Sequence, residues 1–232
     1  MSDSAPKRAR DIARAALIRE ITGTARRHLA EEGATGLSLR AVSRELGMVS
    51  SAIYRYFPSR DALLTQLIVE AYDAVGSAAE QAEAEIDRTD LGGRFAAIAH
   101  GIRDWARTNP HEYALIYGSP VPGYAAPEDT IAPASRVTLL LLRLLADLEA
   151  ADAPLAEPAP ALSSALEAQL AALVADAGLT VSPARMATGI GVWTELYGMI
   201  SFELFGQFQN VFDNADEIFA ARVEAMAARM GV

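Results

Sequence analysis

The chain has 232 residues, of which 51% are hydrophobic and 22% charged, and its formal net charge at pH 7 is −10. It contains no cysteine, which excludes disulfide bonds and thiolate metal sites. The N-terminal residues lack the apolar core of a signal peptide, and the longest aliphatic run, 137–142, is too short to span a bilayer. We therefore expect a soluble, cytoplasmic protein with no membrane partner.

Charge is divided unevenly along the chain. The first 60 residues carry eleven of the 20 basic side chains and only six of the 30 acidic ones, so the remainder is strongly acidic. A basic module joined to an acidic body is typical of a protein that binds an anionic polymer at one end. The alternative is that these basic residues only solvate the surfaces of helices.

The first 57 residues are expected to form a short arm followed by helices. Residues 1–10 are expected to form a disordered arm. A first helix closes at Glu31-Glu32-Gly33, and Ser38 is a natural N-cap for the next, because its hydroxyl can accept a hydrogen bond from an unpaired amide of the first turn. Gly47 lies where the chain must turn between two short helical patterns. Their apolar positions are Leu39, Val42 and Leu46 in the first and Ile53 and Phe57 in the second.

These patterns predict a DNA-binding helix-turn-helix domain over residues 11–58. The second helix begins with small side chains, which let a helix end enter a major groove, and long donors follow. We expect Arg40 and the helix from Ser50 to contact base edges, while Tyr54, Tyr56 and Arg60 contact the DNA backbone. Tyr54 and Tyr56 cannot share one helix face, and Tyr54 is expected to be the exposed one. The candidate DNA-binding residues are Ser38, Arg40, Ser50, Ser51, Ala52, Tyr54, Arg55, Tyr56 and Arg60.

Beyond residue 58 the pattern is helical throughout, with no sustained alternation that would indicate strands, so the predicted fold is all-α. The stretch 118–133, with four prolines and two glycines, is expected to be a loop, and 153–160 a linker rich in proline and alanine. The predicted helices cover 59–84, 91–107, a segment starting at 109, 134–150, 161–177, 182–208 and 214–229.

Two sets of motifs carry a family resemblance. The stretch from about residue 12 to 67 resembles the DNA-binding domain of the tetracycline-repressor (TetR) family of bacterial transcriptional regulators, above all in Ile53-Tyr54-Arg55-Tyr56-Phe57 followed by Ser59-Arg60-Asp61-Ala62-Leu63-Leu64. Segments 118–124 and 193–198 are similar to the C-terminal domain of the branch named for a Trp, His, Gly signature, with Tyr197 at the His position.

The resemblance implies a ligand-binding and dimerisation domain over residues 59–232. It implies a homodimer that holds two recognition helices over successive major grooves of a palindromic, double-stranded DNA operator, most readily as a repressor. A small molecule in each C-terminal domain would change the separation of these helices and release the DNA. The sequence does not name the operator, the regulated genes or the effector, and leaves activation open.

Aromatic and aliphatic residues in the middle of the chain are candidates for an effector site. Each could be plain core, but the proline-broken loop 118–133 can leave a cavity above them. Because the expected wall is apolar, the effector would be an apolar, aromatic or acyl-type molecule. The candidate ligand-binding residues are Phe95, Ile98, Ile102, Trp105, Tyr113, Ile116, Tyr117, Trp193 and Tyr197.

The last two predicted helices are candidates for the dimer interface. Their apolar residues cover more than the single face that a surface helix buries. We expect them to pack against their symmetry mates in a four-helix bundle, the alternative being that they form only intramolecular core. The candidate interface residues are Met199, Phe202, Phe205, Phe219, Val223 and Met226.

Other classes of function find little support in the residues. His28, His100 and His111 are scattered, with no second ligand at helical spacing, so no metal site is expected. The glycines at 189 and 191 lie within a helical pattern, not after a strand, and predict no dinucleotide cofactor. No base is placed to activate Ser50 or Ser51, so no catalytic residue is assigned. The alternatives are a helical dimeric binding protein without DNA function and, third, an enzyme.

Overall fold

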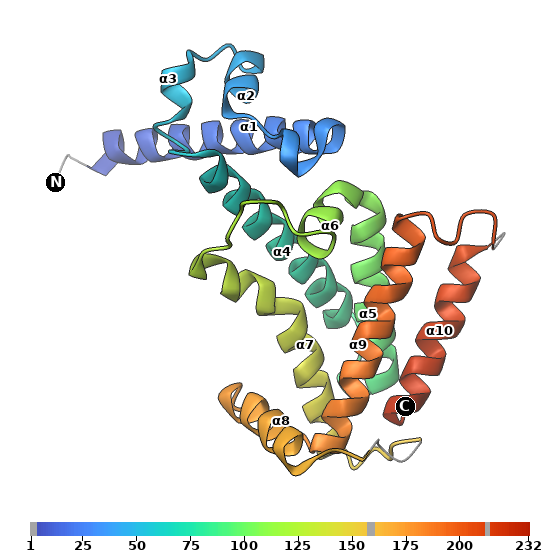
Figure 1. Ribbon diagram of the computed structural model, residues 1–232. Helices are drawn as coiled ribbons and strands as arrows, with labels where there is room; N and C mark the ends of the chain where they lie inside the picture. The colour runs from blue at the N-terminus through green and yellow to red at the C-terminus, as the bar shows by residue number, and fades with distance from the viewer. Residues whose placement is uncertain (1–3, 157–160, 212–213) are drawn as a thin grey trace. The chain divides into compact units, whose positions relative to one another are not determined.

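The computed structural model describes residues 4–156, 161–211 and 214–232 (Figure 1). Over these residues the chain forms ten α-helices and one short 3-10 helix, η1, and no strand, which confirms the all-α prediction. No helix of the described part is both long and apolar enough to cross a membrane. The chain divides into two compact units, the first formed by Met1–Tyr72 and Asn109–Pro133, the second by Asp73–Thr108 and Ala134–Val232.

The first unit contains the predicted helix-turn-helix. Its core is a cluster of buried side chains that includes Ile21, Val42, Ile53 and Leu63, with α6 residues such as Ile116 packed against it. Its elements are α1 (Ser4–Gly36), α2 (Leu39–Glu45), α3 (Ser50–Ile53), the beginning of α4 (Arg60–Ala84), α6 (Pro110–Tyr117) and η1 (Glu128–Thr130).

The turn between α2 and α3 depends on Gly47. Its φ of 65° lies in the left-handed region, where a side chain would be strained. The Gly47 amide donates to the Arg44 carbonyl, and the Met48 amide donates to the Ser43 carbonyl over 2.8 Å. This pair of bonds is a Schellman motif, which satisfies the last carbonyls of α2 and reverses the chain direction.

The second unit is built around α9. This helix packs against α5, α8 and α10, and its buried side chains include Val192, Leu196 and Ile200. Side-chain oxygens of Ser163, Ser182 and Asn214 cap the helices that follow them. Besides the end of α4, the helices of the unit are α5 (Leu91–Thr108), α7 (Ile131–Ala150), α8 (Ser164–Asp176), α9 (Pro183–Leu204) and α10 (Ala215–Met230).

Some boundaries differ from the sequence prediction. Helix α1 begins at Ser4, within the segment expected to be disordered, and α7 begins at Ile131 instead of residue 134. Helix α9 ends at Leu204, four residues early, because Gly206 adopts a φ of 79° and the Gln207 amide turns back to the Phe202 carbonyl. Part of the predicted 153–160 linker, residues 157–160, lies outside the described residues.

The division into units also differs from the predicted boundary after residue 58. The first unit continues into α4 and includes the segment from Asn109 to Pro133. The cause is a set of contacts within this unit: the Arg26 guanidinium on α1 binds Glu112 on α6 at 2.7 Å and also binds Glu70 on α4. Helix α6 is thereby fastened to the helix-turn-helix.

A buried guanidinium joins three helices of the second unit. The side chain of Arg94 on α5 is 2% exposed and binds Glu83 on α4 at 2.6 Å and Asp147 on α7 at 2.8 Å. Burial alone would lower the pKa of Arg94, but these two carboxylates outweigh it and raise the pKa. The charge is therefore retained inside the fold.

We expect Arg94→Met to lower the free energy of unfolding by about 3 kcal/mol, because it leaves the buried Glu83 carboxylate with fewer partners. Arg143→Met, at an exposed position of α7, is the control and should change it by less than about 0.5 kcal/mol. Urea unfolding of both variants measures the difference. Equal stability of the two variants would show that the buried network does not hold these helices.

Candidate nucleic-acid interface

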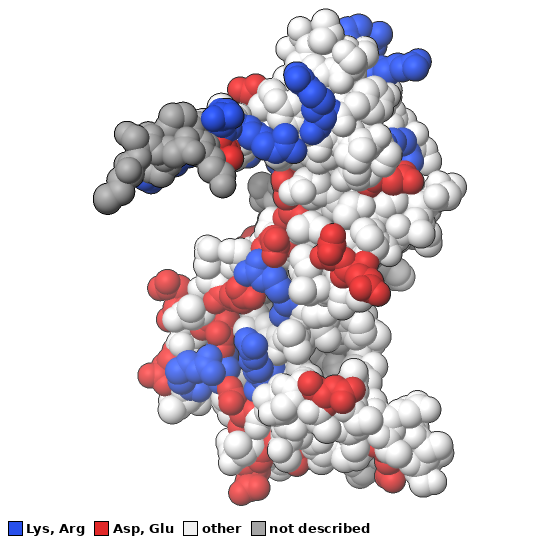
Figure 2. All heavy atoms as spheres, turned by 90° about the vertical axis from the view of Figure 1, so that its left-hand side faces the viewer, with Lys and Arg blue, Asp and Glu red and all other residues white. Residues whose placement is uncertain are grey.

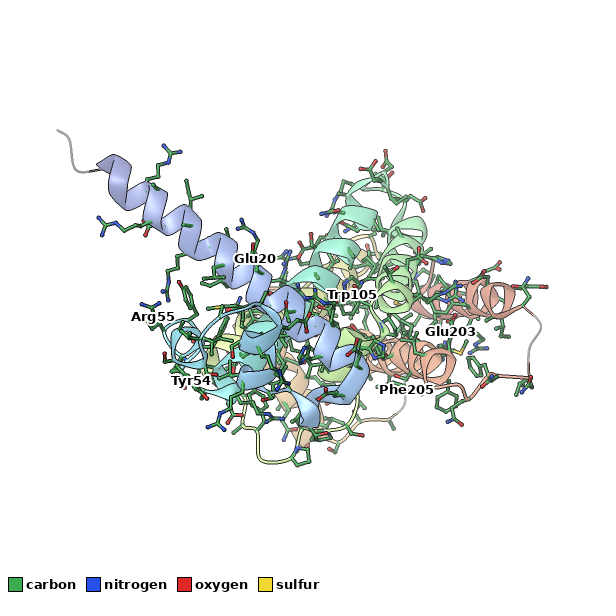
Figure 3. The ribbon with its side chains drawn as sticks, turned by 90° about the horizontal axis from the view of Figure 1, so that it is seen from above. Glu20, Tyr54, Arg55, Trp105, Glu203 and Phe205 are labelled. Atoms are coloured by element: carbon green, nitrogen blue, oxygen red, sulfur yellow. The ribbon has the colours of Figure 1, made fainter. Side chains whose placement is uncertain are left out.

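The outer side of α3 and the turn after it presents small and polar groups. Ser50, Ser51 and Arg55 are exposed, Ala52 is half-buried, and Tyr54 is 44% exposed. Figure 3 shows Tyr54 and Arg55 at the outer edge of the helix-turn-helix. They are held there because Ile53 and Phe57 are buried in the core beneath them. The arrangement leaves the beginning of α3 narrow enough to enter a DNA major groove.

The two tyrosines have different surroundings. Tyr56 packs against the core of the first unit, and the Arg14 guanidinium lies over its ring at 5.0 Å from the centroid. Tyr54 is the more exposed ring, in the orientation expected from the sequence. Only Tyr54 therefore presents its ring outward from this turn.

Two further candidate DNA-binding side chains, Ser38 and Arg60, make contacts within the protein. Ser38 is the N-cap of α2, and its hydroxyl accepts a hydrogen bond from the Ala41 amide. Arg60 donates to the carbonyls of Leu37 and Ala34, at 3.1 and 2.5 Å, and lies 3.6 Å from Asp61. The Arg60 guanidinium thus holds the end of α1 and the residue that follows it to the start of α4, a contact the sequence interpretation did not foresee.

A charged clamp holds α2 against α1. The Glu45 carboxylate binds Arg27 at 2.7 Å and the His28 ring at 2.6 Å. Hydrogen bonds from Arg27 and, second, from His28 hold the pKa of Glu45 below its usual range. Because Glu45 is the last residue of α2, the clamp fixes the direction from which the chain enters the turn at Gly47.

The structure adds residues that the sequence interpretation did not single out. Val49 precedes α3 and is 71% exposed, and Arg44 is exposed on α2 next to Arg40. The sequence contains a signal for Val49, because this apolar residue stands between the turn glycine and the small residues at the start of α3. Figure 2 shows Arg side chains over the first unit, while Asp and Glu are more frequent over the second.

The second unit contains an apolar cavity. Its volume is about 200 Å³, and it lies where α7, α8 and α9 meet. Trp193, 40% exposed, is the one member of the candidate ligand-binding set that lines it. The walls offer hydrocarbon and two hydroxyls, so the cavity suits an uncharged apolar molecule. The lining residues are Ser135, Thr138, Leu139, Leu141, Leu142, Leu145, Leu173, Ala177, Met186, Gly189, Ile190 and Trp193.

The structure does not bring the other candidate ligand-binding residues into this cavity. Ile98, Ile102 and Trp105 are buried in the core of the second unit. Tyr113, Ile116 and Tyr117 lie on α6 and belong to the first unit. Phe95 lines only a neighbouring void of about 20 Å³, and Tyr197 packs edge-on against Trp193 at 6.0 Å. The helical pattern identified these residues as inward-facing, but not which gap between helices stays open.

The candidate dimer residues fall into two groups. Phe202 and Phe205, at the end of α9, are 54% and 48% exposed, and Met199 is half-buried. Figure 3 shows Phe205 projecting outward. Phe219, Val223 and Met226 on α10 are instead at most 3% exposed within one protomer. Because α10 packs against α5 and α9, these three side chains are intramolecular core and cannot form the interface directly, which corrects the sequence interpretation.

We expect Arg60→Ala to lower the free energy of unfolding by about 1–2 kcal/mol, because two carbonyls lose a charged donor. Arg40→Ala removes an exposed arginine of the same unit and should stay within about 0.5 kcal/mol of the wild type. Urea unfolding followed by circular dichroism compares the two. If Arg60→Ala were as stable as Arg40→Ala, the Arg60 contacts would be structurally unimportant.

Comparison with known proteins identifies the family. Residues 21–67 match the model of the bacterial regulatory proteins of the tetR family, and residues 95–226 match the tetracyclin repressor-like C-terminal domain. The HTH-type transcriptional regulator Rv1816 of Mycobacterium tuberculosis is 37% identical over 224 residues, which are 93% of this chain and 93% of that protein.

Solved structures of regulatory proteins have a similar fold. The proposed regulatory protein SCO4313 superposes with a TM-score of 0.77 at 30% identity, covering 93% of this chain and 97% of that one. The TetR family transcriptional regulator PfmR from Thermus thermophilus shares the fold, with a TM-score of 0.59 at 17% identity over 90% of this chain and 97% of that one. The chain therefore belongs to the TetR family of DNA-binding transcriptional regulators, which are not enzymes.

Proposed function

We propose that this regulator is a homodimeric, ligand-responsive repressor. It binds a palindromic operator through α2 and α3, and it leaves the operator when a small apolar molecule fills the cavity between α7, α8 and α9. The observation that carries the ligand response is this cavity, which lies wholly in the second unit and has an almost purely hydrocarbon lining.

The exposed side chains on α2, on α3 and beside α3 have the chemistry that DNA recognition requires. Arg40 can donate to guanine edges, and Ser50 and Ser51 are short enough to let the backbone of α3 approach the bases. Val49 suits the methyl group of thymine. Tyr54 and Arg55, at the other end of the helix, are assigned to phosphates, which position the protein without selecting sequence.

The exposed ends of α9 and the outer face of α10 support the dimer. Phe202 and Phe205 form an apolar edge at the end of α9. Small side chains on both helices permit close approach of a second copy, as isologous helix packing requires. The exposed or half-buried small residues include Gly191, Thr194 and Gly198 on α9 and Ala220, Ala221 and Ala228 on α10.

The cavity favours a particular class of effector. An engineered cavity of about 150 Å³ in another protein binds benzene, so a cavity of about 200 Å³ suits a slightly larger hydrocarbon group. Among the described lining residues none is charged, so a charged ligand would lose its solvation without gaining a partner. Ser135 and Thr138 can orient one polar group of the ligand.

The covalent chain supplies a route for the response. Helix α4 begins in the first unit and ends in the second, and the segment from Asn109 to Pro133 belongs to the first unit although α5 and most of α7 belong to the second. A ligand that binds one arrangement of these helices more tightly shifts the population toward it, and DNA affinity changes by the same coupling free energy.

The dimer is tested by placing charges on its proposed edge. We expect the double variant Phe202→Glu and Phe205→Glu to sediment as a monomer of 24.7 kDa, whereas the wild type sediments as a dimer, because two charges cannot be buried in an apolar interface. Leu166→Glu, at an exposed apolar position of α8, is the control and should remain dimeric. A monomeric wild type, or a double variant that stays dimeric, would contradict this interface.

The effector is tested by DNA release. We expect naphthalene or decanol to release the wild type from duplex DNA selected by the protein from a random pool, while decanoate, the charged counterpart of decanol, acts weakly. Leu139→Trp fills the cavity and should bind DNA but lose the response, since the ligand has no room. Ile131→Trp adds the same ring at an exposed position of α7 outside the lining and should respond normally. If only charged ligands release DNA, or if Leu139→Trp responds normally, this site is wrong.

A further inference from the structure

One face of α1 changes character along its length. Positions 10, 14, 17, 21 and 25 recur at helical spacing and form a single stripe. At Ile21 and Ala25 the stripe is buried in the core of the first unit, and Leu17 packs against its edge. One and two turns further toward the N-terminus, the same stripe presents Arg14 and Arg10. The face that packs on the helix-turn-helix thus continues beyond it as a basic face.

Arg14 connects this face to the end of the recognition turn. Its guanidinium lies over the ring of Tyr56 and donates to the carbonyl of Arg55 over 3.5 Å. Figure 3 shows the first turns of α1 running out past the helix-turn-helix, with Arg55 close to the helix. The basic stripe therefore begins beside the residues assigned to DNA phosphates.

The extension lies outside the core of the first unit. Residues 8–15 are all exposed, and Arg14 reaches back to Tyr56 and the Arg55 carbonyl. Four of the eight residues are alanine or isoleucine and three are arginine, and alanine and arginine have high helix propensity. The extension also continues a helix that is already nucleated by the buried part of α1, which removes the cost of starting a new one.

We propose that the Arg10 and Arg14 face of α1 is a second contact surface for double-stranded DNA, which binds phosphates flanking the bases faced by α3. Arg10 lies one helical turn beyond Arg14, about 6 Å along the axis, a span of about two base-pair steps. The contact lengthens the footprint of each protomer and adds affinity that is insensitive to sequence.

The chain offers a matched control for this surface. Arg19 is an exposed arginine of the same helix, nine residues from Arg10 and so on the opposite side. Removing either side chain changes the net charge equally. A general attraction between a basic domain and DNA would weaken similarly in both variants, whereas a phosphate contact of the stripe would be lost in one only.

The experiment measures the salt dependence of binding to a duplex selected by the wild type from a random pool, prepared with and without a few flanking base pairs. Arg10→Ala should weaken binding to the longer duplex by about two- to fivefold and reduce the slope of log affinity against log salt by about 0.9. On the shorter duplex Arg10→Ala should match the wild type. Arg19→Ala should match the wild type on both, and Arg10→Lys should retain the wild-type slope.

Several results would overturn the inference. If Arg10→Ala and the wild type had equal salt slopes, Arg10 would make no phosphate contact. If Arg10→Ala and Arg19→Ala lost equal affinity, the effect of Arg10 would be only long-range attraction. A loss that persists on the short duplex would place the contact elsewhere. Circular dichroism checks the helix, which alanine should preserve. A wild-type chain that bound no duplex would overturn the DNA-binding function itself together with this surface.

Discussion

The left-handed conformation of Gly47 is the constraint on which the DNA-binding surface depends. It allows the chain to reverse after α2 while the carbonyls of Arg44 and Ser43 remain hydrogen-bonded. The reversal brings Ile53 and Phe57 back onto the core that already contains Val42. Once these are buried, helical geometry leaves Ser50, Ser51 and Arg55 outside. A residue with a Cβ at position 47 would strain this turn by roughly 1–2 kcal/mol.

Charge pairs fix the orientation that the turn creates. Glu45 ties the end of α2 to α1 through Arg27 and His28, and Arg60 ties the start of α4 to carbonyls at the end of α1 and just after it. Arg26 then joins α1 to α4 and α6. The segment containing α6 is thus mechanically part of the DNA-binding unit. The two ends of this segment continue into α5 and α7.

The second unit combines a closed core with an apolar cavity between α7, α8 and α9. Phe219, Met226 and Leu196 fill the space between α5, α9 and α10. Helix α8 contributes only Leu170 and Val174 as buried residues, so it covers α7 and α9 incompletely. The apolar cavity forms where this cover is thin. A bound hydrocarbon would remove the apolar lining of this cavity from water, which is favourable.

Residue pattern alone determined the elements of this protein, because caps, glycines and apolar spacing act within a few residues of one another. Ser38 and Gly47 each fulfil their expected local role, and the helix-turn-helix follows from them. The spacing of apolar residues also shows which side of a helix is buried. It does not show which neighbour covers that side, and so the pattern predicts an interface position for Phe219, which is core. The cavity beside Trp193, the carbonyl partners of Arg60 and the inclusion of α6 in the first unit were decided only by the tertiary structure, since each depends on how distant segments meet.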